Sequence, residues 1–266
     1  MKALKLYAVG YLVFLYAPIL LLPLFAFNDA KVISFPLSGF TTHWFTEMTK
    51  IPALNAAFKN SLTIALCAAL ISTILGIFAA RAATRFSFAG KGPIMGLIML
   101  PLVLPDVIVA ISLLVVLLQL GIALQTWTVI MGHVLICLPF SIAILNAAFQ
   151  ALDRSLEEAA IDLGETRVST FRLVILPLVM PGIISSLLIA FTISFDEFIV
   201  SYFLTGSSPT LPVYIYGQFR YPAKVPVIMA LGTLLVLGSF VLLSIAEYFR
   251  RRGIKRRGGQ DTGGFL

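Results

Sequence analysis

The sequence predicts an all-α protein that crosses a membrane several times. Hydrophobic residue types make up 59% of its 266 residues, and charged types only 12%. A soluble domain of this length carries more charge and fewer apolar residues. The apolar residues also form long unbroken runs, without the alternation of a barrel strand. Within lipid, the backbone of such a run satisfies its own hydrogen bonds only as a helix.

Six runs are long enough to cross ~30 Å of hydrocarbon, which takes ~20 residues of helix. These are residues 6–27, 58–80, 93–118, 127–149, 178–204 and 225–249. The first run is longer than the apolar region of a signal peptide, and no clear small-residue cleavage site follows, so we interpret it as a retained span. The sequence therefore predicts a single transmembrane domain over residues 1–266.

Prolines punctuate several of the six runs. Pro101 and Pro105 lie in the third, Pro139 in the fourth, and Pro177 and Pro181 at the start of the fifth. Each proline removes a backbone donor and disturbs a helix. A simple kink and a broken helix that lines a cavity are both compatible with this pattern.

Small residues form a stripe on the second run. They are Ala65, Ala69, Ser72, Gly76 and Ala80, and their spacing of three or four residues places them on one helix face. In membranes such a stripe lets two helices approach closely. The stripe predicts a packed bundle.

The basic residues predict the orientation of the chain. With the N-terminus inside, most of the 19 lysines and arginines fall in cytoplasmic segments, including a basic tail at residues 250–257. This bias predicts that both termini are cytoplasmic. We interpret the tail as facing the membrane or anionic lipid rather than nucleic acid.

The cysteines and histidines give no sign of a metal or catalytic site. Cys67 and Cys137 lie inside predicted spans, and their spacing fits neither a disulfide framework nor a metal site. We expect both to be packing residues. His133 is expected to be a packed polar residue in the fourth span, and neither it nor His43 is assigned a role.

A charged loop at residues 150–177 interrupts the apolar sequence. Ser155 and Glu158 have the spacing of a capping box at a helix start, and acids gather in the first turns. Gly164 suits a helix end that needs a positive φ. A second helical stretch over residues 166–176 is expected to end at Pro177. The loop is longer than a connector needs, which favours a binding role.

The charged loop resembles the EAA loop of ABC importer permeases. The family pattern is EAA-x3-G-x9-I-x-LP, and here it reads Glu158-Ala159-Ala160, then Gly164, then "VILP" ending at Pro177, with valine in the isoleucine position. The resemblance implies that a short helix docks into a groove of a cytoplasmic ATPase subunit and couples ATP hydrolysis to the bundle. By resemblance the coupling residues are Glu157 or Glu158 for a basic group of that subunit, Ala159 and Ala160 for close contact, Gly164 for the turn, and Asp162 and Pro177 within the same loop.

The same resemblance implies the partners. The chain lacks the G-x-x-x-x-G-K-[ST] loop that binds phosphates. It is therefore expected to have no catalytic residue and no cofactor of its own, with ATP and Mg bound by the partner ATPase. The implied assembly lies in a bacterial inner membrane. It holds a second, PotB-like permease subunit, two ATPase subunits and an extracytoplasmic solute-binding protein that would dock on residues 28–57 and 205–224.

Longer stretches resemble the spermidine/putrescine permease group, in particular its PotC-like half. They include "LVLPDVIVAISLLVVL", "LPLVMPGIISSLLIAFTISFDEFIVSYFLTG" and "LPVYIYGQFR". The resemblance covers nearly the whole chain and implies transport of polyamines.

Acidic residues inside the spans agree with a cationic substrate. Asp106, Asp196 and Glu197 lie at membrane depth, where ionisable groups are costly and face an interior or an aqueous path. Apart from Lys59 at the edge of the second run, no lysine or arginine lies inside a predicted span. We expect these acids to line the route, with ring faces for ammonium groups from Phe195, Tyr202, Tyr214 and Tyr216. Bonds to the backbone or to a partner permease are the alternative.

Two other functions remain open from the sequence. The same machine could carry another small solute, such as an amino-acid derivative, a quaternary amine or a metal complex. A self-contained secondary transporter, driven by ion gradients, is the second alternative. That class is typically built from inverted repeats, which this sequence does not show.

Overall fold

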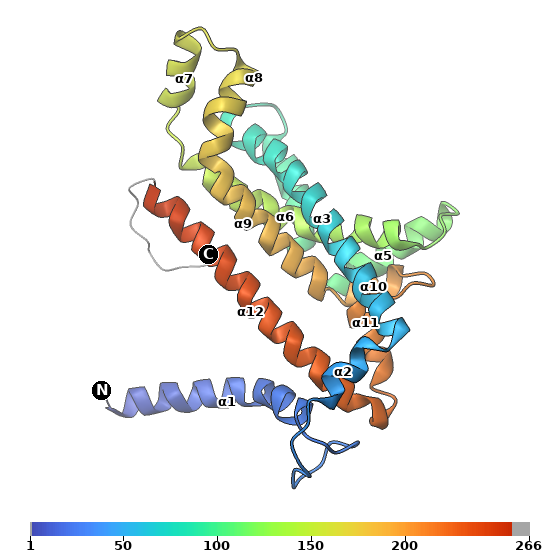
Figure 1. Ribbon diagram of the computed structural model, residues 1–266. Coiled ribbons are helices and arrows are strands. Elements are labelled where there is room, and N and C mark those ends of the chain that lie inside the picture. Colours follow the sequence, from blue (N-terminus) through green and yellow to red (C-terminus); the bar gives the residue numbers. More distant parts are fainter. Residues whose placement is uncertain (1, 257–266) are drawn as a thin grey trace. The chain divides into compact units, whose positions relative to one another are not determined.

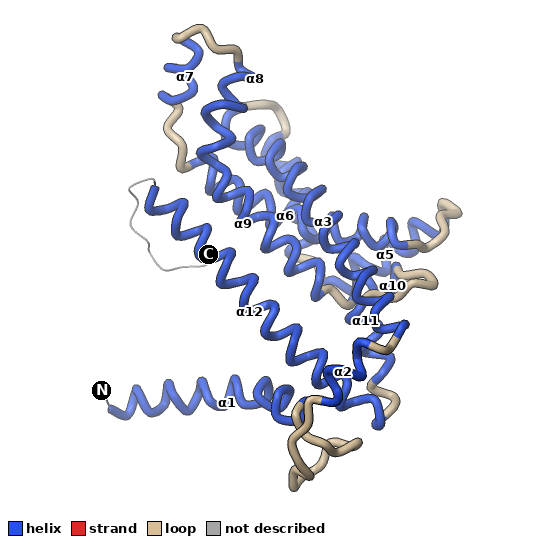
Figure 2. Tube along the Cα trace, viewed as in Figure 1, coloured by secondary structure: helices blue, strands red, loops and turns tan. Residues whose placement is uncertain are grey.

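The computed structural model describes residues 2–256, and these are almost wholly helical (Figures 1 and 2). The α-helices are α1 (Lys2–Ala26), α2 (His43–Thr49), α3 (Pro52–Arg85), α4 (Lys91–Met99), α5 (Asp106–Gln119), α6 (Thr126–Gln150), α7 (Ser155–Asp162), α8 (Arg167–Thr170), α9 (Leu176–Asp196), α10 (Ile199–Leu204), α11 (Leu211–Gln218) and α12 (Val225–Arg256). Short 3-10 helices η1 (Leu100–Leu102) and η3 (Pro222–Lys224) and a π-helix η2 (Phe171–Ile175) complete the order.

Five stretches of helix are long and apolar enough to span a membrane. They are Leu4–Ala26, Pro52–Arg85, Thr126–Gln150, Arg167–Asp196 and Pro222–Ile245. A sixth span is possible if the bent pair Lys91–Leu102 and Asp106–Gln119 counts as one. The prediction of an all-α membrane protein is confirmed. Of the predicted basic tail at residues 250–257, only Arg257 lies outside the described residues.

The third span is broken rather than straight. Its two halves meet at an angle of 105°, so of the two alternatives left open by its prolines, a kink and a broken helix, the structure has the broken helix. Pro105 is the N-cap of α5, with extended φ and ψ of −58° and 132°. A proline has no backbone donor and disfavours helical geometry in the residue before it, so the helix stops here and restarts in a new direction. By contrast, α6 and α9 continue through Pro139 and Pro181.

The fifth span differs from its prediction at both ends. The helix does not end at Pro177: α8, η2 and α9 follow one another without a gap, and Pro177 lies in the first turn of α9. At the other end α9 stops at Asp196, because Glu197 takes an extended ψ of 114°. The chain turns helical again in α10. The predicted run over residues 178–204 therefore contains a break.

The chain divides into two compact units, and we describe each separately. The first contains Met1–Lys59 and Leu211–Phe240. Its core gathers Ala26, Trp44, Val227 and Ala230. Asn28 organises the nearby loop: its backbone carbonyl accepts the Trp44 indole N–H at 2.8 Å, and its side-chain oxygen accepts the Ser38 amide at 3.0 Å. The single-domain prediction stays a prediction.

The second unit contains Asn60–Thr210 and Val241–Leu266 and is built around the packed pair of α6 and α9. Gly182 of α9 lies against Ala148 of α6, so closely that a Cβ at Gly182 would come within 2.6 Å of the Ala148 methyl. Phe149, Ile175 and Val179 are fully buried beside this contact. The glycine thus sets how near the two spans approach.

The stripe of small residues on α3 packs against α6 as predicted. Ala65, Ala69, Ser72 and Ala80 are fully buried. A Cβ at Gly76 would lie 3.0 Å from that of Ser141, and the Ser141 hydroxyl donates to Ser72 Oγ at 3.4 Å. The contact shows that α3 and α6 are close neighbours.

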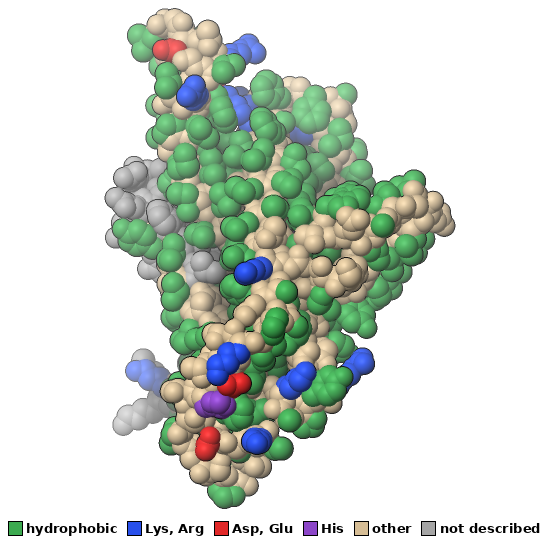
Figure 3. Space-filling view, turned by 45° about the vertical axis from the view of Figure 1, so that its right-hand side comes forward, with side chains coloured by type: hydrophobic (Ala, Val, Ile, Leu, Met, Phe, Trp, Pro, Cys, Tyr) green, Lys and Arg blue, Asp and Glu red, His purple; other side chains and the backbone are tan. Residues whose placement is uncertain are grey.

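Hydrophobic side chains cover most of the molecular face drawn in Figure 3, with few charges among them. Many large apolar side chains are exposed along α1, α3, α5 and α12. Such a surface is unfavourable in water and suits lipid or another apolar subunit.

Candidate functional site

The charged loop folds into α7, a turn and α8. Gly164 has a φ of +92°, which confirms the prediction of a positive-φ turn. Its amide donates to Ile161 O at 2.9 Å, and the Glu165 amide donates to Ala160 O at 3.1 Å. This pair of bonds is the Schellman motif, which ends a helix where glycine tolerates the left-handed conformation.

The predicted capping box at Ser155 and Glu158 is wrong. The N-cap of α7 is Arg154, which makes no side-chain capping bond. Instead, the Ser155 amide donates to Asp153 Oδ1 at 3.0 Å. This bond lowers the pKa of Asp153. An aspartate that accepts from an amide two residues on forms an Asx turn, and this local signal competes with the capping box.

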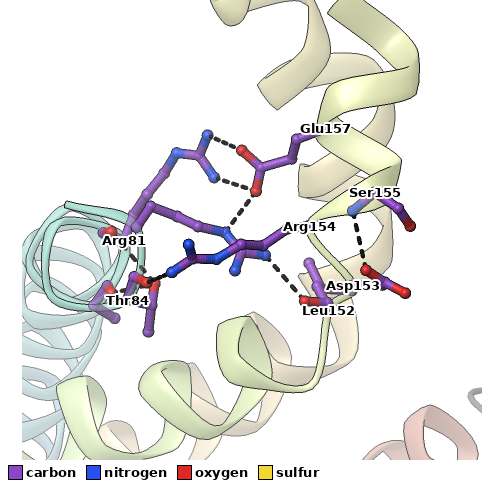
Figure 4. Close-up of polar contacts among 9 residues, drawn as sticks. Arg81, Thr84, Leu152, Asp153, Arg154, Ser155 and Glu157 are labelled. Carbon is purple, nitrogen blue, oxygen red and sulfur yellow. Dashed lines mark hydrogen bonds and ion pairs between the residues drawn. The ribbon is translucent and has the colours of Figure 1, made fainter.

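Two arginines of α3 hold the carboxylate of Glu157. Arg85 Nε donates to Glu157 Oε1 at 2.7 Å. Arg81 donates from Nη2 to Oε2 at 3.0 Å and from Nη1 to Oε1 at 3.4 Å (Figure 4). The three side chains are only 10–20% exposed. We call this group the Arg81–Arg85–Glu157 clamp.

The charge state of Glu157 follows from the clamp. Burial opposes ionisation of its carboxyl, but the hydrogen bonds and positive charges of Arg81 and Arg85 outweigh burial. The net effect lowers the pKa of Glu157 below its ordinary value of 4.5. Glu157 is therefore an anion at neutral pH.

The remaining residues of the loop differ in exposure. Glu158, Ala159 and Asp162 are exposed, whereas Ala160 is buried. Of the two glutamates expected to meet an ATPase subunit, Glu157 is thus already paired within the chain and Glu158 is exposed. Pro177 lies inside the continuous helix rather than at its end.

The predicted pathway acids lie at two helix breaks. Asp106 is the first residue of α5, directly after the break in the third span. Glu197 lies in the break of the fifth span, between α9 and α10, and α10 packs against α5. Asp106 and Glu197 thus lie at the starts of two helices that pack together. The structure therefore places these two acids on neighbouring elements.

Glu197 also has a local structural role. Its Oε1 accepts the Val200 amide at 3.0 Å, and so caps the start of α10. For Glu197, the structure thus shows the hydrogen bond to the backbone that was the alternative to a place on the substrate route. Asp196 is the last residue of α9 and is exposed. Thr192, one turn earlier, donates its hydroxyl hydrogen to Leu188 O at 2.9 Å.

The predicted aromatic residues are only partly gathered. Phe195 stacks on Phe191 with ring centroids 5.6 Å apart, and Tyr202 lies 5.5 Å from Phe198. Both pairs flank the break in the fifth span. Tyr214 and Tyr216 lie on α11, in the other unit. Their predicted place beside the acids stays a prediction.

His133 is the residue of this region whose role the sequence did not indicate. Its Nδ1 lies 2.7 Å from Ser194 Oγ on α9, and its Nε2 lies 2.9 Å from Ser201 Oγ on α10. The expectation that His133 is a packed polar residue is confirmed. The ring also joins the two helices across the break.

The fold and these features define a membrane-embedded transporter subunit, and the comparison with known proteins agrees. Residues 72–255 match the family described as binding-protein-dependent transport system inner membrane component. The chain belongs to this family. The resemblance stated from the sequence is confirmed, and a self-contained secondary transporter is excluded.

Relatives match over nearly the full chain. The putrescine transport system permease protein PotI of Escherichia coli (strain K12) is 38% identical over 253 residues, which cover 92% of this chain and 89% of the relative. The spermidine/putrescine transport system permease protein PotC of the same strain is 34% identical over 247 residues, covering 92% and 93%. PotC of Haemophilus influenzae is 33% identical over 240 residues, covering 90% and 93%.

Solved structures share the fold. A bacterial ABC transporter involved in the import of the acidic polysaccharide alginate has a chain that is 20% identical, with a TM-score of 0.72 over 96% of this chain and 94% of that one. A chain of an amino acid ABC transporter is 21% identical, with a TM-score of 0.60 over 80% and 100%. The type I importer permease fold expected from the sequence is confirmed.

Proposed function

We propose that this chain is a permease subunit that imports polyamines, putrescine and spermidine, by alternating access. The observation that carries the proposal is the pair of carboxylates, Asp106 and Glu197, at adjoining helix breaks. Among the side chains that the structure describes, neither acid takes part in an ion pair. Like charges held together in a low-dielectric region favour a multivalent cation. The putrescine and spermidine permeases that match most of the chain support the same substrate.

The energy for import is proposed to come from a separate ATPase subunit that docks on α7. The exposed side chains of α7 include Leu156 and Ile161 together with the carboxylates of Glu158 and Asp162, and the exposed Leu163 follows as the C-cap. A surface that combines apolar and acidic side chains fits a groove with a basic group in its wall. ATP and Mg would be held by that ATPase, and this chain would supply no catalytic residue.

The full assembly is proposed to contain this chain, a second permease subunit, two ATPase subunits and an extracytoplasmic solute-binding protein. The binding protein would dock on residues 28–57 and 205–224. Both termini would lie in the cytoplasm, as the distribution of lysine and arginine indicates. One solved neighbour of this fold is a transporter in complex with a periplasmic protein.

The test is uptake of radiolabelled putrescine and spermidine by the whole assembly in proteoliposomes, with and without ATP. We expect ATP-dependent uptake of both. Asp106→Asn and Glu197→Gln should each raise KM, by about tenfold for the loss of one charge interaction. Spermidine carries one more ammonium group than putrescine, so its KM should rise more. This difference serves as an internal control, because a folding defect affects both substrates alike.

Two results would contradict the proposal. If the assembly took up another solute with ATP but did not take up polyamines, the chain would still be an ABC permease, but polyamines would not be its substrate. Uptake that does not respond to ATP would remove the coupling itself.

A further inference from the structure

We propose that Arg81 and Arg85 are positioning residues, which lock helix α7 to span α3 so that the two move together. This proposal rests on the proposed docking of α7 on an ATPase subunit. It assigns Glu157 to an internal contact and Glu158 to the partner. It also makes α3 the first span to receive the motion of the ATPase.

Helix α7 needs an outside support. It has only eight residues, Ser155–Asp162, and isolated helices shorter than ~12 residues are marginal in water. Ala160 is its only buried residue, and its N-cap makes no side-chain bond. The apolar contacts of α7 are therefore few, and the paired Glu157 is its strongest polar anchor.

The two arginines reach three points of the charged loop. Beyond Glu157, Arg85 donates from Nη2 to Leu152 O at 3.1 Å, where the chain leaves α6. Arg81 lies over the ring of Phe171, 5.0 Å from its centroid, where the chain enters η2. The start, the middle and the end of the loop are thus tied to one face of α3, on which residues four apart are neighbours.

The chemistry of the clamp suits transmission of force. A guanidinium binds through a planar fork of fixed geometry, which resists rotation and sliding better than a single point charge. The low exposure of the three side chains limits screening by salt. Removal of one partner would leave a shielded charge unpaired. A displacement of α7 is therefore passed to α3 rather than absorbed by the loop.

The experiment measures substrate imported per ATP hydrolysed by the whole assembly in proteoliposomes. Glu157→Gln and Arg85→Gln should each lower this ratio about tenfold, as expected for the loss of a charge-assisted bond, while ATP hydrolysis persists. The double variant should be no worse than either single one, because both remove the same contact. Arg85→Lys should not restore the ratio, since an ammonium cannot serve Glu157 and Leu152 O in the same geometry.

A matched control is Arg172→Gln. It removes the same charge from an exposed position in η2, and the ratio should stay at the wild-type level. Effects of the two single variants that multiply in the double variant would overturn the proposal. A wild-type ratio in the single variants would overturn it as well.

If the single variants do not assemble, a charge exchange tests the same contact. Arg85→Glu combined with Glu157→Arg should recover assembly and part of the ratio, and failure to recover either would overturn the clamp. The proposed function is tested separately by the wild type. If uptake by the wild type needs no ATP, both the proposed coupling and the proposed role of the clamp are contradicted. If uptake by the wild type needs ATP but the variants behave like it, only the role of the clamp is contradicted.

Discussion

The imidazole of His133 in α6 holds the hydroxyl of Ser201 in α10 at 2.9 Å. The other ring nitrogen holds Ser194 of α9 at 2.7 Å, so one side chain joins both sides of the break in the fifth span. A neutral imidazole has one donor and one acceptor, and a hydroxyl can act as either. The three buried side chains therefore satisfy one another's hydrogen bonds without a net charge. These bonds hold the two parts of the broken helix together at membrane depth.

Replacement of His133 by leucine should destabilise the protein. Two buried serine hydroxyls would lose their partner, at a cost of about 1–3 kcal/mol each. We expect a lower Tm of the purified protein. Thr192→Val is the control, because the Thr192 hydroxyl bonds only to its own helix at Leu188 O. Equal Tm values for the two variants would contradict a bracing role of His133.

Substitutions at Gly164 should rank by their tolerance of positive φ. No atom lies within 4 Å of an added Cβ, so the φ of +92° is the main constraint. A left-handed conformation costs a non-glycine residue about 1–2 kcal/mol, less for asparagine and more for a β-branched residue. ATP-driven uptake should therefore fall in the order Gly, Asn, Ala, Val. An alanine variant that outperforms asparagine would show that φ is not the determinant.

The close contact of Gly182 with Ala148 predicts that a destabilising substitution at one position is compensated by a smaller residue at the other. Gly182→Ala places two methyl groups 2.6 Å apart, and overpacking of this kind costs about 1–3 kcal/mol. Thermal unfolding should show a lower Tm for Gly182→Ala and recovery when Ala148→Gly is added. A double variant that is less stable than Gly182→Ala would mean that the helices meet elsewhere.

The clamp predicts a dependence of stability on acid. The folded state lowers the pKa of Glu157 below 4.5, so its contribution is present above that pH and is lost as the pH falls through the lowered pKa. The difference in Tm between the wild type and Glu157→Gln should be constant near neutral pH and should shrink below pH 4.5. A difference that persists unchanged in acid would assign the effect of the variant to packing.

The sequence predicted the features that depend on local pattern. Apolar runs located the spans because hydrophobic length is read directly from composition. Gly164 and the stripe from Ala65 to Ala80 were also predicted, because turn chemistry and helical spacing need no knowledge of partners. Pro177 misled the prediction of a helix end, since proline is tolerated in the first turn of a helix.

The contacts that join distant residues were not predictable in this way. The apolar run of α3 ends near Ala80, yet the helix continues to Arg85 because alanine and arginine are strong helix formers. Only this added turn places Arg81 and Arg85 beside Glu157, which is 72 residues away from Arg85. The pairing of His133 with Ser194 and Ser201 likewise spans 61 and 68 residues.

The π-helix at Phe171–Ile175 ends two residues before Pro177, whose ring would collide with the carbonyl four residues earlier in a regular α-helix. Such a wide turn contains one residue more than an α-helical turn of the same rise. Deletion of one residue here would leave the apolar face of α9 unchanged. It would also swing everything before it by about 100° around the helix axis. The number of residues in this π-helix therefore sets the orientation of α7. A deletion or insertion there would rotate the proposed docking surface without changing its residues.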